Sequence, residues 1–181
     1  MESSLLVAVP SAKPLVRWTR LRFDTGARRG LPPHVTVLYP FVSPRDLSES
    51  VIAQLRDIFA DSPPFTFSLT EVAWFGDSMA YLTPEPSRPF EDLTWRVLEL
   101  FPEYPPYRGA YGTRSVVPHL TLGKRERPAA LQRAARRAEK GLPIQATARE
   151  VLLMARGPRS STWRVRQVFP LGGRSGTSAY C

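Results

Sequence analysis

The sequence predicts an α+β fold made of two similar halves. The run Pro33-His34-Val35-Thr36-Val37-Leu38 returns as Pro118-His119-Leu120-Thr121-Leu122, and the two histidines are 85 positions apart. In each half, a predicted strand and a predicted helix come before this motif. Hydrophobic residues make up 43% of the 181 residues, which is enough for a sizeable core. We therefore expect a duplicated, bilobal arrangement in which antiparallel-rich sheets are flanked by helices.

The first half alternates predicted strands and helices. A buried strand is expected over Leu5–Val9, and a helix over Ala12–Phe23 with Ser11 as its cap. Helical spacing with the neighbouring leucines places Trp18 in the core. After the first motif strand come a helix capped by Ser43 over Pro44–Phe59 and an alternating strand over Phe65–Phe75.

The second half repeats this order and then adds two strands. Its elements, in chain order, are a turn at Gly76–Ser78, a strand over Met79–Leu82, a proline-rich connector over Pro84–Pro89, a helix over Phe90–Phe101, a loop over Pro102–Gly112, the second motif strand, a helix over Pro128–Lys140 that stops at Gly141, a strand over Ile144–Ala155, a turn at Gly157-Pro158 and a strand over Thr162–Leu171. We expect residues 1–172 to form one bilobal domain and residues 173–181 to form a disordered tail.

The two motifs use every histidine in the protein. Because side chains alternate along a strand, His34 and Thr36 share one face, and His119 and Thr121 share another. A single His-x-Thr is common in ordinary strands, but two copies that consume both histidines favour catalysis. A metal site is the alternative, since histidine is a frequent ligand. Neither motif, however, carries a Cys, Asp or Glu at ligand spacing, so we expect no metal.

This doubled signature resembles that of the 2H phosphoesterase superfamily, which includes the 2'-5' RNA ligase-like proteins and cyclic nucleotide phosphodiesterases. The longer phrase from Gly30 to Phe41 is similar to the bacterial 2'-5' RNA ligase-like branch in particular. The resemblance implies a bilobal fold whose central cleft carries both His-x-Thr strands. It also implies a substrate, an RNA-type 2',3'-cyclic phosphate or a 2'-5' phosphodiester, and no cofactor.

Paired imidazoles suit displacement at phosphorus. With ordinary pKa values near 6.5, one histidine can act as a neutral base while the other acts as a protonated acid. The hydroxyls of Thr36 and Thr121 can donate hydrogen bonds to phosphoryl oxygens. A Ser-His-Asp enzyme is less compatible, because no Gly-x-Ser-x-Gly occurs. The symmetric motif leaves open which histidine is the acid.

Residues near the motifs are candidates for binding the substrate. The aromatic candidates are Tyr39, Phe41, Phe75 and Tyr107. Each could instead pack in the core or in a loop. Two cations that flank the second motif, Arg114 and Lys124, could meet phosphate or could be simply solvated.

Charge and cysteine content indicate the partners and the compartment. The net charge of +9 points to polyanions, although a coding bias toward arginine would produce it too, and the arginines look scattered along the chain. The one cysteine, Cys181, allows no internal disulfide, which fits the cytoplasm. The apolar run Leu5–Val9 is too short for a membrane span.

These observations leave two functions open. The first is a monomeric phosphoesterase or RNA-end-processing enzyme that acts on an RNA end or a small cyclic nucleotide. The second is an RNA- or nucleotide-binding module without turnover. The two intact motifs favour the enzyme, because a binding module needs arginines more than it needs paired imidazoles.

Overall fold

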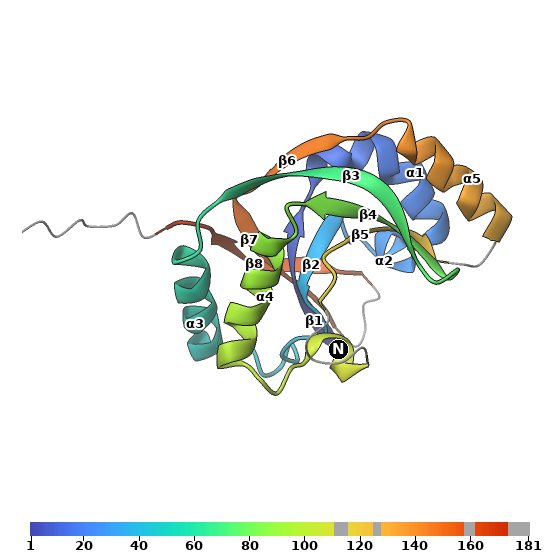
Figure 1. The fold of residues 1–181 in the computed structure, drawn as a ribbon. Coiled ribbons are helices and arrows are strands. Elements are labelled where there is room, and N and C mark those ends of the chain that lie inside the picture. Colours follow the sequence, from blue (N-terminus) through green and yellow to red (C-terminus); the bar gives the residue numbers. More distant parts are fainter. Residues whose placement is uncertain (111–115, 125–127, 158–161, 174–181) are drawn as a thin grey trace, which may run out of the picture.

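The computed structural model describes residues 1–110, 116–124, 128–157 and 162–173 (Figure 1). The described elements in chain order are β1 (Glu2–Ala8), η1 (Pro10–Ala12), α1 (Lys13–Phe23), α2 (Thr25–Arg28), β2 (His34–Leu38), α3 (Glu49–Ala60), β3 (Phe65–Phe75), β4 (Met79–Glu85), α4 (Arg88–Leu100), η2 (Pro106–Gly109), β5 (Leu120–Lys124), α5 (Pro128–Glu139), β6 (Ile144–Ala148), β7 (Glu150–Arg156) and β8 (Arg164–Pro170).

The strands form two four-stranded antiparallel sheets. One sheet has the order β2-β1-β7-β8 and the other the order β5-β4-β3-β6. Each sheet combines strands from both halves of the chain, because β3 pairs with β4 and β7 pairs with β1. The motif strands β2 and β5 are the edge strands of their sheets, and they lie against each other. The two motifs therefore lie next to each other in the fold, although they are far apart in the sequence.

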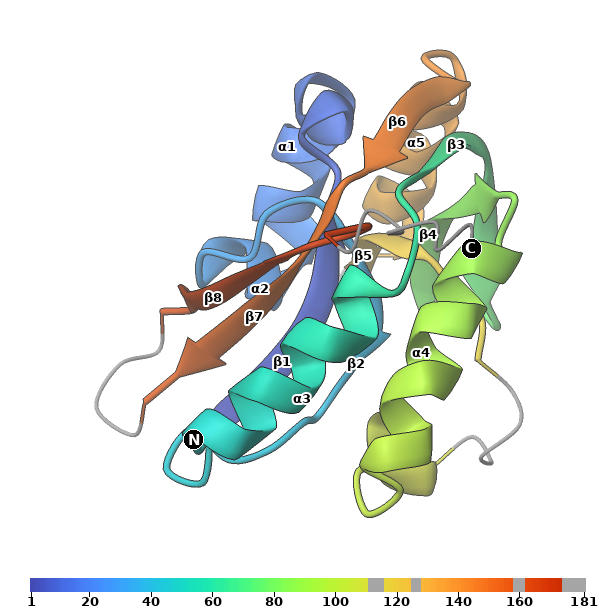
Figure 2. The ribbon, with the colours of Figure 1, turned by 90° about the vertical axis from the view of Figure 1, so that its left-hand side faces the viewer.

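Each sheet is covered by two helices. α1 and α5 pack on the sheet of β5, whereas α4 packs on β2 and α3 on β8 (Figures 1 and 2). The helix that follows the first strand of one half thus covers the motif strand of the other half. This arrangement confirms the predicted duplicated α+β fold with antiparallel sheets flanked by helices.

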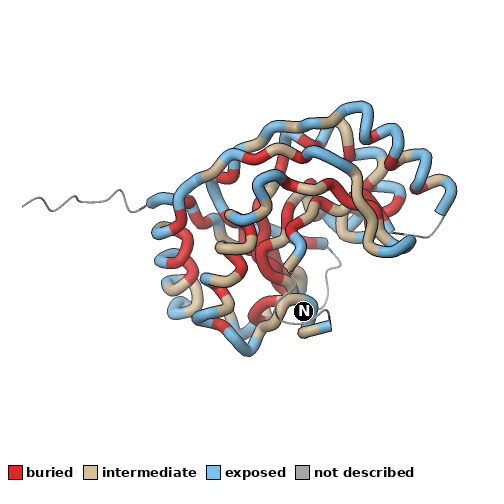
Figure 3. Tube along the Cα trace, viewed as in Figure 1, coloured by how far each residue is buried: buried red, intermediate tan, exposed pale blue. Residues whose placement is uncertain are grey.

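The alternation within the motif strands separates core from site. Val35 and Val37 of β2, like Leu120 and Leu122 of β5, are buried, while the intervening side chains are only partly buried. Most buried side chains of the two sheets, together with those of α1, α3, α4 and α5, form one hydrophobic core (Figure 3). The opposite face of each motif strand is therefore free to carry polar chemistry.

The prediction that Trp18 lies in the core is wrong, because its side chain is 77% exposed. The buried positions of α1 are instead Val16, Arg20 and Phe23. Arg20 is 2% exposed and pairs with Asp24, so an arginine takes the place that the hydrophobic pattern gave to the tryptophan. The face of α1 turned toward the core is consequently rotated from the predicted one.

Several element boundaries also differ from the prediction. The helix predicted from Pro44 begins at Glu49, since the cap is Ser48, whose hydroxyl accepts from the backbone N–H of Val51. Ser43 heads a turn instead, in which its carbonyl accepts from Asp46. The connector predicted over 84–89 is shorter, because β4 runs to position 85 and α4 begins at position 88.

The strand predicted over Ile144–Ala155 is in fact two strands. β6 pairs with β3 in one sheet, and β7 pairs with β1 in the other, with Arg149 between them. The short helix α2, which lies between α1 and the first motif, is capped by the Asp24 carboxylate. Pro158 of the predicted turn and residues 174–181 of the predicted tail lie outside the described residues. None of the described helices combines the length and the apolar character that a membrane crossing requires.

Candidate active site

The first motif is held at the edge of its sheet by pairing with β1. Ala8 lies opposite His34, and Leu6 lies opposite Thr36. The His34 ring donates a hydrogen bond from Nδ1 to the carbonyl oxygen of Pro32, at 2.7 Å. Because a carbonyl can only accept, this bond places the proton of the neutral ring on Nδ1 and leaves Nε2 with its lone pair.

The second motif repeats this geometry. His119 lies directly before β5, and its Nδ1 donates to the carbonyl oxygen of Val117, also at 2.7 Å. In both motifs the acceptor is the carbonyl two residues before the histidine. Each imidazole is therefore oriented by its own backbone, with Nε2 as the nitrogen that can exchange a proton with a substrate.

Burial lowers the pKa of both histidines. For His34, burial is the largest cause, and the Arg20 guanidinium and the charge of His119 act in the same direction, so the pKa falls from 6.5 to about 4. Burial and then Lys124 lower the pKa of His119, against the opposing effect of its hydrogen bond to Val117. The influence of one imidazole on the other agrees with the contact between β2 and β5.

A buried ion pair lies beside the first motif. The Arg20 guanidinium donates to Asp24 Oδ2 from Nε and Nη2, at 3.2 and 2.8 Å, and from Nη1 to the carbonyl of Leu31, at 3.4 Å. The other carboxylate oxygen of Asp24 accepts from the backbone N–H of Gly26 at 2.8 Å. This pair joins α1 to the segment that supplies the Pro32 carbonyl, so it supports the orientation of His34.

Two aromatic rings surround His119. The predicted candidate Phe75 meets the imidazole edge-on, with ring centroids 5.0 Å apart, and Tyr81 does the same at 5.3 Å. Phe75 and Tyr81 stack on each other at 4.3 Å. Sequence reasoning missed Tyr81, although it lies opposite Thr121 in the strand pairing and so faces the motif. These contacts position the second imidazole.

The two threonines lie on the same strand faces as the histidines. Thr36 and Thr121 are both partly buried, each two residues after its histidine. The Thr121 hydroxyl lies 3.9 Å from the Met79 sulfur, a weak acceptor, so a phosphoryl oxygen would be a better partner.

The remaining aromatic candidates separate into two environments. Tyr39 contacts Tyr107 and Trp163 edge-on, at 6.5 and 6.3 Å, and Trp163 belongs to a small apolar cluster on the His34 face of the sheet. Tyr107 has φ of 50°, which is unusual for a residue other than glycine. Phe41 is 4% exposed and packs against Phe101, so it belongs to the core.

The two cationic candidates are placed differently. Lys124 ends β5 opposite Met79 and is exposed, and its charge reaches His119. Arg114 lies outside the described residues. Among the residues that the structure describes, no group of three His, Cys, Asp or Glu side chains could hold a metal ion.

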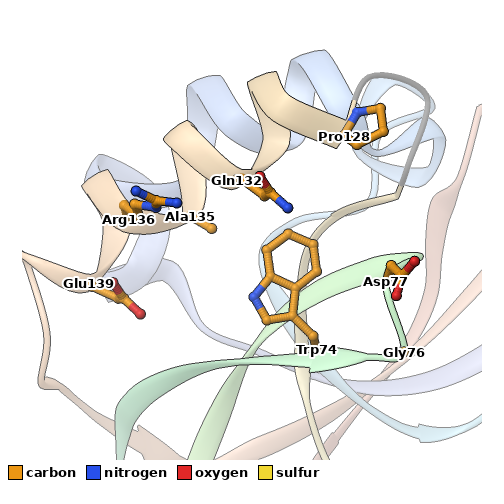
Figure 4. Close-up of a pocket in the computed structure, with 8 residues that line it drawn as sticks. All are labelled: Trp74, Gly76, Asp77, Pro128, Gln132, Ala135, Arg136 and Glu139. Carbon is orange, nitrogen blue, oxygen red and sulfur yellow. The ribbon is translucent and has the colours of Figure 1, made fainter.

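A cavity of about 700 Å³ lies on the other side of the β5 sheet (Figure 4). It is bounded by Trp74 of β3, the turn at Gly76 and Asp77, and one flank of α5. None of the predicted site residues that the structure describes lines it. Trp74 follows the opposite alternation from Phe75, so the cavity and His119 are separated by the sheet.

Comparison with known proteins identifies the family. The family model of the 2'-5' RNA ligase superfamily matches residues 9–159. The chain belongs to this superfamily. The resemblance inferred from the twin motifs, to the 2H phosphoesterases and their 2'-5' RNA ligase-like branch, is thereby confirmed.

Relatives of this superfamily member agree with that assignment. A candidate phosphoesterase of Geobacillus kaustophilus is 31% identical over 97 residues, which cover 52% of each chain. A second candidate phosphoesterase, from Bacillus licheniformis, is 27% identical over 128 residues, or 66% of this chain and 69% of that protein. The matched region thus spans about half the length of the first relative.

Two solved structures match almost the whole chain in fold. TT0787 of Thermus thermophilus aligns with a TM-score of 0.63 and 18% identity, and covers 96% of this chain and 100% of that one. E. coli LigT complexed with 3'-AMP aligns with a TM-score of 0.58 and 18% identity, with coverage of 94% and 97%. At these identities the likeness concerns the fold.

Proposed function

We propose that the protein is a metal-independent phosphoesterase that acts on 2',3'-cyclic phosphates or 2'-5' phosphodiesters of RNA type. The observation that supports this most is the repeated tether of the imidazoles, with Nδ1 of His34 and of His119 each 2.7 Å from the carbonyl two residues earlier. A nucleotide-binding surface needs no such control of tautomers, whereas acid–base catalysis requires a free and oriented Nε2.

In the proposed hydrolysis, a water molecule attacks the phosphorus of a 2',3'-cyclic phosphate. The neutral His34 takes the proton of the water at Nε2, and the protonated His119 gives its Nε2 proton to the leaving 3' oxygen. The P–O3' bond breaks, a P–O bond to water forms, and the product carries a 2'-phosphate. Of the two, His34 is assigned as base because its pKa is held at about 4, so it remains neutral in weak acid. Ligation would use the same groups in reverse.

The threonines complete the proposed site. Thr36 and Thr121 would donate hydrogen bonds to the non-bridging phosphoryl oxygens, whose charge grows during the displacement. The negative phosphate would also raise the pKa of the nearby His119, and so favour the protonated acid in the complex. We place the substrate between β2 and β5, where Phe75, Tyr81 and Tyr39 offer rings for a base. LigT, which shares the fold, binds 3'-AMP.

A turnover assay tests this proposal. Purified protein is given a panel of 2',3'-cyclic mononucleotides, short RNAs with cyclic phosphate ends and 2'-5' dinucleotides. His34→Ala and His119→Ala should each lower the rate on the best substrate by about 10²–10⁴-fold. Thr36→Val and Thr121→Val should lower it by about 10²-fold.

A chelator separates this mechanism from metal catalysis. The rate should be unchanged by EDTA, since neither motif needs a divalent ion. Activity that disappears with EDTA and returns with added metal contradicts the mechanism. Binding without turnover of any panel member would support the alternative of a nucleotide-binding module.

A further inference from the structure

The two helix pairs that cover the sheets differ sharply in charge. α1 and α5 together carry seven cationic side chains and one acidic one, whereas α3 and α4 carry three cationic and five acidic ones. The two pairs occupy equivalent places in the duplicated fold, so a coding bias toward arginine would enrich both. The helices α1 and α5 instead carry a net charge of +6 and the helices α3 and α4 a net charge of −2, so the arginines of the long helices are not evenly distributed.

α1 and α5 lie side by side and run in opposite directions (Figure 1). Near the start of α1, Leu15 packs against Gly141, which follows α5, so closely that a Cβ on that glycine would be 2.6 Å from Leu15 Cδ1. Near the end of α1, Phe23 and Leu131 both approach Gly123. The end of α5 therefore lies beside the start of α1, and the start of α5 lies beside the end of α1.

The charged side chains of the two helices lie on their exposed sides. Gln132, Arg136 and Glu139 line the cavity on one flank of α5 (Figure 4), whereas Arg133 and Arg137 lie away from that flank, on the solvent-exposed side of the helix. Trp18 and Arg22 follow Leu15 by three and seven positions, which places them on the flank of α1 turned toward α5. All four side chains are exposed.

Trp18 is 77% exposed, and the Arg17 guanidinium carbon lies 5.8 Å from the centre of its ring. The exposed indole therefore offers a ring next to a cation, at a position where it can stack on a ligand. We call the exposed set Arg17, Trp18, Arg22, Arg133 and Arg137 the basic face. Cations spaced along two helices with an aromatic ring between them are suited to phosphates and an unpaired base.

We propose that the basic face binds the body of single-stranded RNA, whose end is processed at the histidines. The inference rests on the proposed function for the role of that end, but the binding itself does not require turnover. The positive surface continues from α1 into α2, where Arg28 donates to the carbonyl of Arg22 at 3.0 Å, and α2 ends six residues before His34. The body of a chain could thus follow this edge toward the first motif.

The test measures binding of a fluorescein-labelled 12-nucleotide single-stranded RNA with an ordinary 3'-hydroxyl, so that no turnover is involved. Trp18→Ala should weaken binding about tenfold, from lost stacking on a base, while Trp18→Phe should largely keep it. Arg133→Ala/Arg137→Ala should weaken binding and reduce the log–log salt slope by about 0.7 for each phosphate contact removed.

The matched control is Arg56→Ala/Arg96→Ala, which removes two exposed arginines from α3 and α4. This variant should bind the RNA like wild type, and all variants should turn over a 2',3'-cyclic mononucleotide at the wild-type rate. The proposal is overturned if the basic-face variants bind RNA like wild type, or if the control loses as much affinity. Displacement of the RNA by polyglutamate at equal charge concentration would also overturn it, in favour of an acidic protein partner. Absence of turnover with every member of the substrate panel would refute the proposed function, and would leave the RNA-binding result to be judged separately.

Discussion

Acidification is expected to destabilise the protein through His34. Burial, and then the charges of Arg20 and His119, lower the pKa of this side chain to about 4 in the folded state, against the raising effects of its hydrogen bond to Pro32 and of Asp24. The unfolded chain keeps the ordinary value near 6.5. The unfolded state therefore takes up the proton first as the pH falls. This contribution to stability is complete above the unfolded pKa and is lost progressively toward the folded one.

The pKa values of His34 in the folded and unfolded states set how much stability is lost. Between pH 8 and pH 5 they correspond to a decrease of about 2 kcal/mol in the free energy of unfolding. The assay is urea unfolding of wild type and His34→Asn at both pH values. Asparagine removes the titration but retains an N–H that can donate to the Pro32 carbonyl.

Other groups titrate in both proteins. The contribution of His34 is therefore the difference between wild type and His34→Asn in how far the free energy of unfolding falls between pH 8 and pH 5. Wild type should lose about 2 kcal/mol more than His34→Asn. Equal losses in the two proteins would refute the inference that the folded protein holds this imidazole neutral.

Three further predictions concern the residues that support the site. Arg20→Met should destabilise the protein by about 3–5 kcal/mol in urea unfolding, because it leaves the Asp24 carboxylate buried without its partner. The double variant Arg20→Met/Asp24→Asn should recover part of this loss of stability. No loss of stability in the single variant would contradict a structural ion pair. Gly123→Ala should cost about 1–3 kcal/mol, since its Cβ would lie 2.5 Å from Phe23 Cβ, whereas Gly157→Ala, with open space around it, should change little. Tyr81→Leu should reduce kcat/KM on a cyclic mononucleotide about two- to twelvefold through the lost ring contact with His119, and an unchanged value would remove Tyr81 from the site.

The sequence was sufficient for the parts of the fold that depend on local periodicity. The alternation in the two motifs correctly separates the buried Val35 and Leu122 from the polar face, and the long helices lie near their predicted positions. The repeat of the motif also predicts the duplication, because two copies of one strand–helix–strand unit are expected to fold alike.

Other features depend on contacts between distant segments. The hydrophobic pattern of α1 gives Trp18 the buried position, because it cannot show that Arg20 will be neutralised by Asp24. No composition change at Arg149 marks where the chain passes from one sheet to the other. Tyr81 is recognised as a neighbour of His119 only once the register of β4 and β5 is known.

The central claim is that His34 and His119 act as a base–acid pair. The most direct test is the pH dependence of kcat/KM on a 2',3'-cyclic mononucleotide for wild type, His34→Ala and His119→Ala. Because the pKa values of both imidazoles are lowered, wild type should give a bell centred below pH 6.5, the ordinary pKa of histidine. The residual activity of His34→Ala should lack the limb on the acid side, and that of His119→Ala the limb on the basic side. A bell with both limbs intact in either variant would contradict the claim.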